Sequence, residues 1–162
     1  MAVLTYSARA SLAKYILSRQ LFLAIGTGSE DWDEVPDAPD YAATGLINEI
    51  GRKKLTRAFF VNEDENGEID MPAGRRYSYS ESPTRQIYLH FMFDYGEGLA
   101  NSIREIGVFM DSEVNANLPE TQTFFTPEQI VNQGTLILLE HLETPDTFTP
   151  NKKGSYGTIL TI

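Results

Sequence analysis

The stretch from Gln86 to Tyr95, QIYLHFMFDY, carries a regular alternation of residue types. Every second residue from Ile87 to Phe93 is a large apolar residue, and the residues between them are mixed in character. Successive side chains of a strand point to opposite faces, so a period of two predicts a β-strand. We therefore expect a strand over about 86–95.

Working outward from this strand, other short apolar runs predict further strands. A short turn or helix is expected near 45–51, and Gly107 is expected to interrupt its strand. Asn66-Gly67 is a strong signal for a two-residue hairpin turn. The further strands are predicted at about 21–25, 52–62, 102–111, 135–140 and 156–162.

The N-terminal residues predict a helix. Ser7 can cap it, and it should run to about Ser18, with Leu12, Ile16 and Leu17 on one stripe. The fold class predicted is α+β, with an N-terminal helix and a mainly antiparallel β-sheet domain with long ordered loops. Residues 1–20 would form the helical segment, and residues 21–162 the β-rich domain.

Two long segments lack periodicity. Residues 29–44 are acidic and contain Pro36 and Pro39, and residues 112–133 look irregular apart from a helical N-terminus at 126–129. Loops longer than about 12–15 residues are uncommon unless they have a role. We expect neighbouring subunits to order them.

Composition excludes several classes of function. The chain has 13 basic and 23 acidic residues and a formal charge of −10, which would repel phosphate backbones, so no nucleic acid partner is expected. It has no cysteine, so disulfides, thiolate metal sites and cysteine nucleophiles are excluded. No apolar run approaches the length of about 20 residues that a membrane span needs. The basic run at 52–54 is expected to be a solvated strand face or a set of salt-bridge partners.

Histidines and acidic turns offer little for a metal site. His90 and His141 each lie in a predicted strand, and with Glu140 or Asp94 they form a candidate metal site. A role as cross-strand partners is favoured over metal binding. The run at 62–67 resembles the start of a calcium loop, but position twelve of that loop is Ala73, so a polar turn is favoured.

Glycine and serine motifs of catalysis are also missing. Gly26-Thr27-Gly28 is followed by carboxylates and prolines, which would repel a pyrophosphate. No serine lies in a nucleophile elbow and no lysine follows a phosphate-binding loop. We therefore predict no enzyme activity, and no catalytic, cofactor-binding or metal-binding residue.

Trp32 is the single tryptophan, and it lies within the acidic segment. It can pack on its own sheet edge or dock on a partner, since tryptophan is enriched among residues that dominate interface energy. Docking predicts that Trp32→Ala impairs assembly more than it lowers the melting temperature. The sequence leaves both roles open.

Two blocks of this sequence resemble bacteriophage baseplate wedge and tail-fibre attachment proteins. The first contains the apolar strand 21–26, the pair Trp32-Asp33, a proline-containing loop and the basic segment 50–55. The second, IREIGVFMD at 103–111, is similar to the REIGLFD element of those proteins. In that family an apolar strand follows, like 136–142 here, and then a closing strand, like 157–162.

The resemblance implies a structural subunit of a contractile-tail baseplate that binds neighbouring wedge or tail-fibre proteins during assembly. It also implies several symmetric copies in each virion, made in the host cytoplasm. Fibre proteins usually continue into a long shaft, whereas this chain stops at Ile162, which favours a compact baseplate subunit or adaptor. The residues expected at the partner interface are Trp32, Asp33, Pro36, Pro39, Arg52, Lys53, Arg104 and Glu105.

Two other functions stay open at this point. Phage tails carry cell-wall hydrolases, and a pair of carboxylates in the loops can serve such chemistry. A small carbohydrate-binding module is the other alternative, using Tyr77, Tyr79, Tyr88 and Tyr95.

Overall fold

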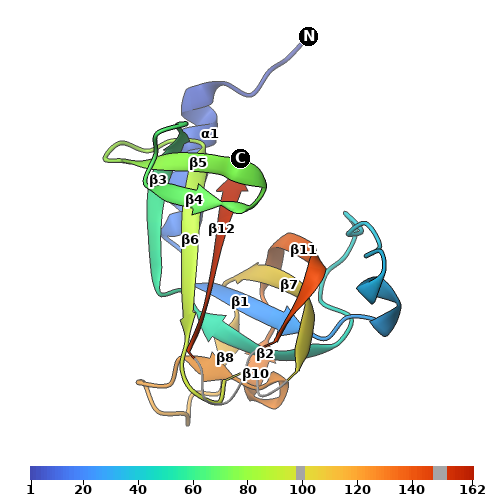
Figure 1. Cartoon of the computed structure of the whole chain (residues 1–162). Coiled ribbons are helices and arrows are strands. Elements are labelled where there is room, and N and C mark those ends of the chain that lie inside the picture. The colour runs from blue at the N-terminus through green and yellow to red at the C-terminus, as the bar shows by residue number, and fades with distance from the viewer. Residues whose placement is uncertain (98–100, 148–152) are drawn as a thin grey trace. The chain divides into compact units, whose positions relative to one another are not determined.

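The structure is a computed structural model that describes residues 1–97, 101–147 and 153–162 (Figure 1). The chain forms two compact units. Unit 1 contains Met1–Arg19, Thr56–Phe91 and Tyr156–Ile162, and unit 2 contains Gln20–Leu55 and Met92–Ser155. The predicted helical segment, 1–20, ends where the chain first passes from unit 1 to unit 2. The domain division at that point stays a prediction.

Helix α1 spans Tyr6–Leu17 in unit 1. Its N-cap is Thr5, whose hydroxyl accepts a hydrogen bond from the backbone N–H of Ala8 at 3.3 Å. The predicted cap at Ser7 is therefore wrong. The Ser7 carbonyl instead accepts a hydrogen bond from the Ser11 hydroxyl within the first turns of the helix.

The buried face of α1 carries small residues. Ala10 and Ala13 are its buried residues, whereas Leu12 is exposed and Ile16 and Leu17 are partly buried. Residues three apart lie on one helix face, so the two alanines define the inward side. The predicted stripe that included Leu12 is wrong, because the helix turns its smallest side chains inward.

Unit 1 contains most of an antiparallel sheet in the order β12-β6-β3-β5-β4. In β6 the buried residues alternate from Ile87 to Phe93, which confirms the predicted period of two. Val61, Ile69 and Tyr77 form a small buried cluster. The strands are β3 (Arg57–Glu63), β4 (Ile69–Met71), β5 (Arg75–Ser80), β6 (Gln86–Phe93) and β12 (Gly154–Thr161), and the 3-10 helix η2 (Pro72–Gly74) precedes β5.

The predicted hairpin at Asn66-Gly67 is wrong in its pairing. A turn is present, since the Gly67 N–H donates to the Asp64 carbonyl at 2.9 Å. However, β5 lies between β3 and β4 and pairs with both. Glycine is needed for another reason: a Cβ at Gly67 would lie 2.2 Å from the backbone carbonyl of Tyr77.

Unit 2 contains a second antiparallel sheet, in the order β11-β7-β1-β2-β9, and a two-stranded sheet, β10-β8. All six residues of β1, which pairs with both β7 and β2, are buried. The strands are β1 (Leu21–Gly26), β2 (Glu49–Lys54), β7 (Ser102–Met110), β8 (Glu113–Val114), β9 (Phe124–Phe125), β10 (Ile130–Asn132) and β11 (Thr135–Thr147), with 3-10 helices η1 (Glu30–Asp33) and η3 (Pro127–Gln129).

Three expectations for the unit 2 region are wrong. The single strand at 52–62 is two strands, because the Leu55 N–H bonds to Leu21 in unit 2 while the Thr56 N–H bonds to His90 in unit 1. The turn or helix near 45–51 gives way to β2 from residue 49. Gly107 does not interrupt β7, since it pairs with residues of both adjacent strands. The α+β class with mainly antiparallel sheets is confirmed.

Candidate functional site

The most unusual surface of unit 2 is the segment from Ser29 to Thr44, here called the acidic loop. It leads from β1 towards β2 and contains one short 3-10 helix, η1. Its sequence has no lysine or arginine. Its carboxylates are Glu30, Asp31, Asp33, Glu34, Asp37 and Asp40.

Trp32 fixes the middle of the acidic loop to the sheet. Its side chain is only 5% exposed, and its ring stacks on His141 of β11 at 4.0 Å between centroids and 23° between planes. The indole Nε1 donates to the Asp37 carboxylate at 3.0 Å, and His141 Nδ1 lies 2.6 Å from the Asp37 carbonyl oxygen. Gly28, at φ +55°, leaves room for the ring, because a Cβ there would lie 2.5 Å from it. The loop is thus folded back on an edge strand.

Arg104 on β7 holds the start of the acidic loop. Its guanidinium donates to both carboxylate oxygens of Asp33, at 2.6 and 3.0 Å, and to the Thr27 carbonyl at 3.2 Å. The hydrogen bond from Arg104 lowers the pKa of Asp33 below its usual value. Paired, two-point hydrogen bonds of this kind fix direction as well as distance.

The next residue on β7, Glu105, holds the segment that follows the acidic loop. Its buried carboxylate accepts the backbone N–H groups of Ile47 at 3.0 Å and Asn48 at 2.8 Å. The Asn48 side chain in turn donates to the Gly28 carbonyl at 2.9 Å. Adjacent residues of one strand therefore position both ends of the acidic loop.

Large apolar side chains remain outside this clamped base. Tyr41 has a relative exposure of 102%, and Val35 and Ile47 are also exposed. Isolated exposed apolar residues are ordinary on protein surfaces, but these lie in or beside a segment that contacts of Trp32, Arg104 and Glu105 hold in place. The exposed apolar side chains therefore lie among the carboxylates of a loop that is held in place by the sheet.

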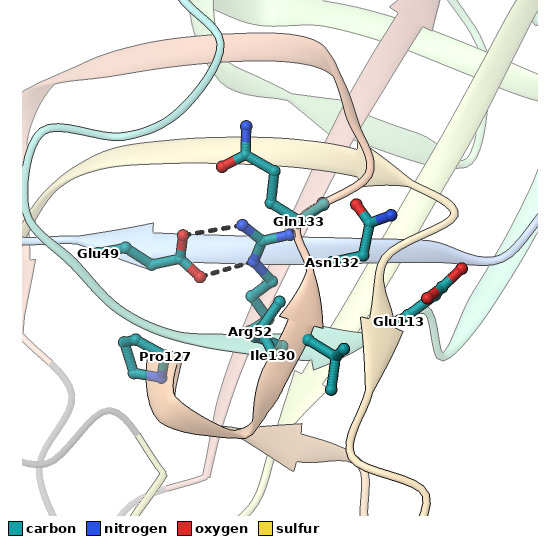
Figure 2. A pocket seen from close by; sticks show the side chains of 8 residues that line it. Glu49, Arg52, Glu113, Pro127, Ile130, Asn132 and Gln133 are labelled. Atoms are coloured by element: carbon teal, nitrogen blue, oxygen red, sulfur yellow. Dashed lines mark hydrogen bonds and ion pairs between the residues drawn. The ribbon is translucent and has the colours of Figure 1, made fainter.

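A second feature of unit 2 surrounds Arg52 of β2, which is 2% exposed (Figure 2). Its guanidinium donates to both oxygens of Glu49 at 2.6 and 3.0 Å, and to the Ser112 hydroxyl at 2.7 Å and the Gln133 carbonyl at 2.6 Å. It also lies 3.7 Å from the centroid of the Phe109 ring. A buried guanidinium with this many partners joins β2 to the segments before β8 and after β10.

A hollow of about 620 Å³ opens beside this guanidinium. Figure 2 shows that Glu49 and Arg52 point toward each other, with Glu113 on β8 and Asn132 on β10 at the other side of the hollow. The hollow is lined by Glu49, Arg52, Glu113, Pro127, Ile130, Val131, Asn132 and Gln133.

Lys53 is also buried, and its ammonium contacts Glu97 at 2.6 Å and the Thr123 hydroxyl at 2.9 Å. Of the two interpretations of the basic run, Arg52 and Lys53 therefore follow the salt-bridge one. Together the two side chains tie β2 to sequence-distant loops of unit 2.

A comparison with known protein families identifies the family of this chain. A family model described as "Baseplate wedge 3 tail fiber network component" matches residues 1–162, the whole chain. The chain belongs to this family. No curated protein matches the chain significantly. The resemblance to baseplate wedge and tail-fibre proteins is therefore confirmed, and this wedge component belongs to the tail baseplate of the virion.

The wedge component shows no constellation of metal ligands in the described ranges, where no group of three or more His, Asp or Glu side chains converges. His90 lies on β6 and His141 on β11, in different sheets. Burial and the nearby Arg57 lower the pKa of His90. None of the helices outside the gaps at 98–100 and 148–152 is long and apolar enough to cross a membrane.

The eight residues predicted at the partner interface all lie in unit 2, but in different surroundings. Those with buried side chains are Trp32, Arg52, Lys53 and Glu105. Those that are partly or fully exposed are Asp33, Pro36, Pro39 and Arg104. The structure thus gives the first four a role in holding the subunit together, and the interface role of the set stays a prediction.

Several residues that shape this site were not singled out from the sequence for that role. Asp37 and His141 complete the Trp32 contact, and Glu49 neutralises Arg52. His141 is 104 positions from Asp37, so no local pattern could connect them. Tyr41, beside Asp40 and close to Pro39, carried a usable signal as an aromatic residue in a polar loop.

Proposed function

We propose that this subunit is a non-enzymatic connector of the baseplate wedge that binds neighbouring wedge or tail-fibre proteins during tail assembly. The family supports a structural role in the baseplate. We further propose that the acidic loop is one of its contact surfaces. The observation that carries this part is the exposed Tyr41 on a loop whose base is fixed by Trp32, Arg104 and Glu105.

A loop fixed before binding is a good contact surface for a thermodynamic reason. Association loses about 0.5–1.5 kcal/mol for each flexible side chain that becomes ordered, and more when backbone must be ordered too. The Trp32 stack and the hydrogen bonds of Arg104 and Glu105 of β7 order the loop when the subunit folds, so this entropy is already lost before binding. Tyrosine adds large contact area with few rotatable bonds, which is why it is enriched at interface cores.

Catalysis by the hollow near Arg52 has no comparable support. Both oxygens of Glu49 are engaged by the Arg52 guanidinium, so this carboxylate is not free to transfer a proton. A glycosidase needs a second carboxylate across a substrate cleft with a distinct environment. Glu113 is exposed to solvent. We therefore propose no hydrolase role.

The contact surface can be tested with the double variant Val35→Ser/Tyr41→Ala. The variant is expected to weaken binding to co-expressed wedge and tail-fibre proteins by about tenfold or more, since interface aromatics dominate binding energy. Its melting temperature should match the wild type, because both side chains are exposed in the free subunit. Retention of the subunit in assembled wedges is measured by affinity purification and size-exclusion chromatography.

Tyr95→Ala is the matched control, because Tyr95 is another exposed tyrosine of unit 2 outside the acidic loop. It should assemble like the wild type. If the double variant enters wedges as completely as Tyr95→Ala, the acidic loop is not a contact surface. If the wild-type subunit enters no wedge at all when the full tail cluster is co-expressed, the connector role itself is refuted.

A further inference from the structure

β11 is an edge strand of the five-stranded unit 2 sheet. This strand spans Thr135–Thr147 and stands at the end of the order β11-β7-β1-β2-β9, so that within the described part of the chain it pairs with β7 on one side only. The outward backbone groups of an edge strand are a template for another extended chain. Proteins that use such an edge for recognition gain main-chain hydrogen bonds from the added strand.

The first part of β11 is apolar but incompletely covered. Leu136, Ile137, Leu138 and Leu139 are all partly buried, and none is fully buried. In the adjacent strand β7, by contrast, residues 105–109 are all fully buried. Partial exposure of four successive large side chains means that some apolar surface remains open along this edge.

A groove of about 210 Å³ runs along this edge. One wall consists of residues 136–139, and the other of Pro39, Asp40, Tyr41 and Ala43 from the acidic loop. Successive strand side chains point to opposite faces, so a groove that touches four in a row follows the strand and not one face of the sheet. Trp32 ties the two walls together, because it belongs to the acidic loop and stacks on His141 of β11.

The charge of the groove selects its occupant. Six carboxylates and no basic residue lie in the acidic loop that forms one wall. A second copy of this chain would bring the same acidic loop and a net charge of −10, so it is repelled.

We propose that this groove binds an extended segment of a neighbouring tail protein, which adds a strand to β11 and alternates apolar with basic side chains. The backbone of the segment pairs with residues 136–139. Its apolar side chains contact the partly buried side chains of residues 136–139, and its lysines or arginines face the carboxylates of the acidic loop. This inference deepens the proposed function and rests on the acidic loop being a contact surface.

Capped peptides and the full-length chain can test the inference. The probe is acetyl-Lys-Val-Lys-Val-Lys-Val-Lys-amide, titrated by calorimetry at low salt. The first control has the same pattern with glutamate in place of lysine. The second control keeps the lysines but is N-methylated on alternate backbone nitrogens, so that it retains charge and loses the hydrogen bonds of a strand.

Binding of the lysine peptide at least about tenfold tighter than either control is expected, equivalent to about 1.4 kcal/mol. Amide hydrogen exchange in residues 135–142 should slow when the lysine peptide binds, while exchange in unit 1 stays unchanged. Equal binding of the N-methylated peptide would overturn strand addition, and equal binding of the glutamate peptide would overturn the charge preference. Absence of binding, protection elsewhere than β11, or self-association of the chain would overturn the inference as a whole.

The two proposals fail in different ways. Loss of wedge binding in Val35→Ser/Tyr41→Ala, together with equal binding of all three peptides, would keep the acidic loop as a contact surface and remove the added strand. Normal wedge assembly by that variant would remove the contact surface whatever the peptides do.

Discussion

Replacing Trp32 by alanine tests whether the acidic loop is held by the subunit itself. The indole is 5% exposed, stacks on His141 at 4.0 Å and donates a hydrogen bond of 3.0 Å to Asp37. Removing a buried aromatic side chain lowers the free energy of unfolding by about 3–5 kcal/mol, a range that includes the lost stacking and hydrogen bond. Burial therefore predicts a large fall in melting temperature, whereas docking of Trp32 on a partner predicts a small one.

The size of the fall follows from chain length. For a protein of this size, each 1 kcal/mol shifts the melting temperature by about 2–4 °C, so Trp32→Ala should lower it by about 6–20 °C. Trp32→Phe keeps a stacking ring but has no N–H for Asp37, and should lose only about 1–2 kcal/mol. Differential scanning calorimetry measures all three proteins, and limited proteolysis should cut the alanine variant first within residues 29–44.

A melting temperature of Trp32→Ala within about 2 °C of the wild type, well below the shift expected for a buried aromatic, would refute this reasoning. A fall of equal size in Trp32→Phe and Trp32→Ala would also contradict it, because the ring would then contribute nothing beyond its N–H group. Phe124→Ala, which removes a partly buried ring of β9, is the control for simple loss of a ring. Gln122→Ala, in another loop of unit 2, removes no ring and cannot serve this purpose.

Three other perturbations have defined outcomes. Arg52→Met should lower the free energy of unfolding by about 3–5 kcal/mol in urea titrations, because it leaves Glu49 without its partner, and adding Glu49→Gln should restore part of the loss. Arg104 lowers the pKa of Asp33, so the stability from this ion pair is present at neutral pH and is lost as Asp33 becomes protonated in acid. Asp33→Asn should therefore reduce the fall in melting temperature between neutral and acidic pH. An unchanged fall would contradict the pairing. Gly67→Ala should destabilise by about 1–3 kcal/mol because its Cβ would meet backbone at 2.2 Å, whereas Gly45→Ala, whose Cβ meets only a side-chain oxygen at 3.7 Å, should melt near the wild type.

The elements that the sequence predicted well are those with a local periodic signal. The alternation in 86–93 and the apolar run 21–26 gave correct strands, since side-chain period depends on a few adjacent residues. Strand order could not be predicted in the same way. The turn at Asn66-Gly67 joins β3 and β4, but β5 pairs between them, and only the packing of the whole sheet decides that.

The candidate site was predictable only in part for the same reason. Trp32 and the basic run at 52–54 were identified by residue type, but their partners lie far along the chain. Lys53 meets Glu97 and Thr123, 44 and 70 positions away. Sequence alone could not distinguish a buried tie of this kind from a surface contact, because that distinction depends on which loops cover the residue.

The interleaving of the two units has a consequence for synthesis on the ribosome. Unit 1 begins with α1 but includes residues 156–162, and β12 belongs to its sheet beside β6. During translation of the intervening unit 2 segments, β6 therefore lacks its partner strand β12, and the sheet of unit 1 is incompletely paired. Loss of β12 should therefore leave the sheet of unit 1 without an edge strand, so a nascent chain arrested before residue 154 is expected to expose β6 to proteases.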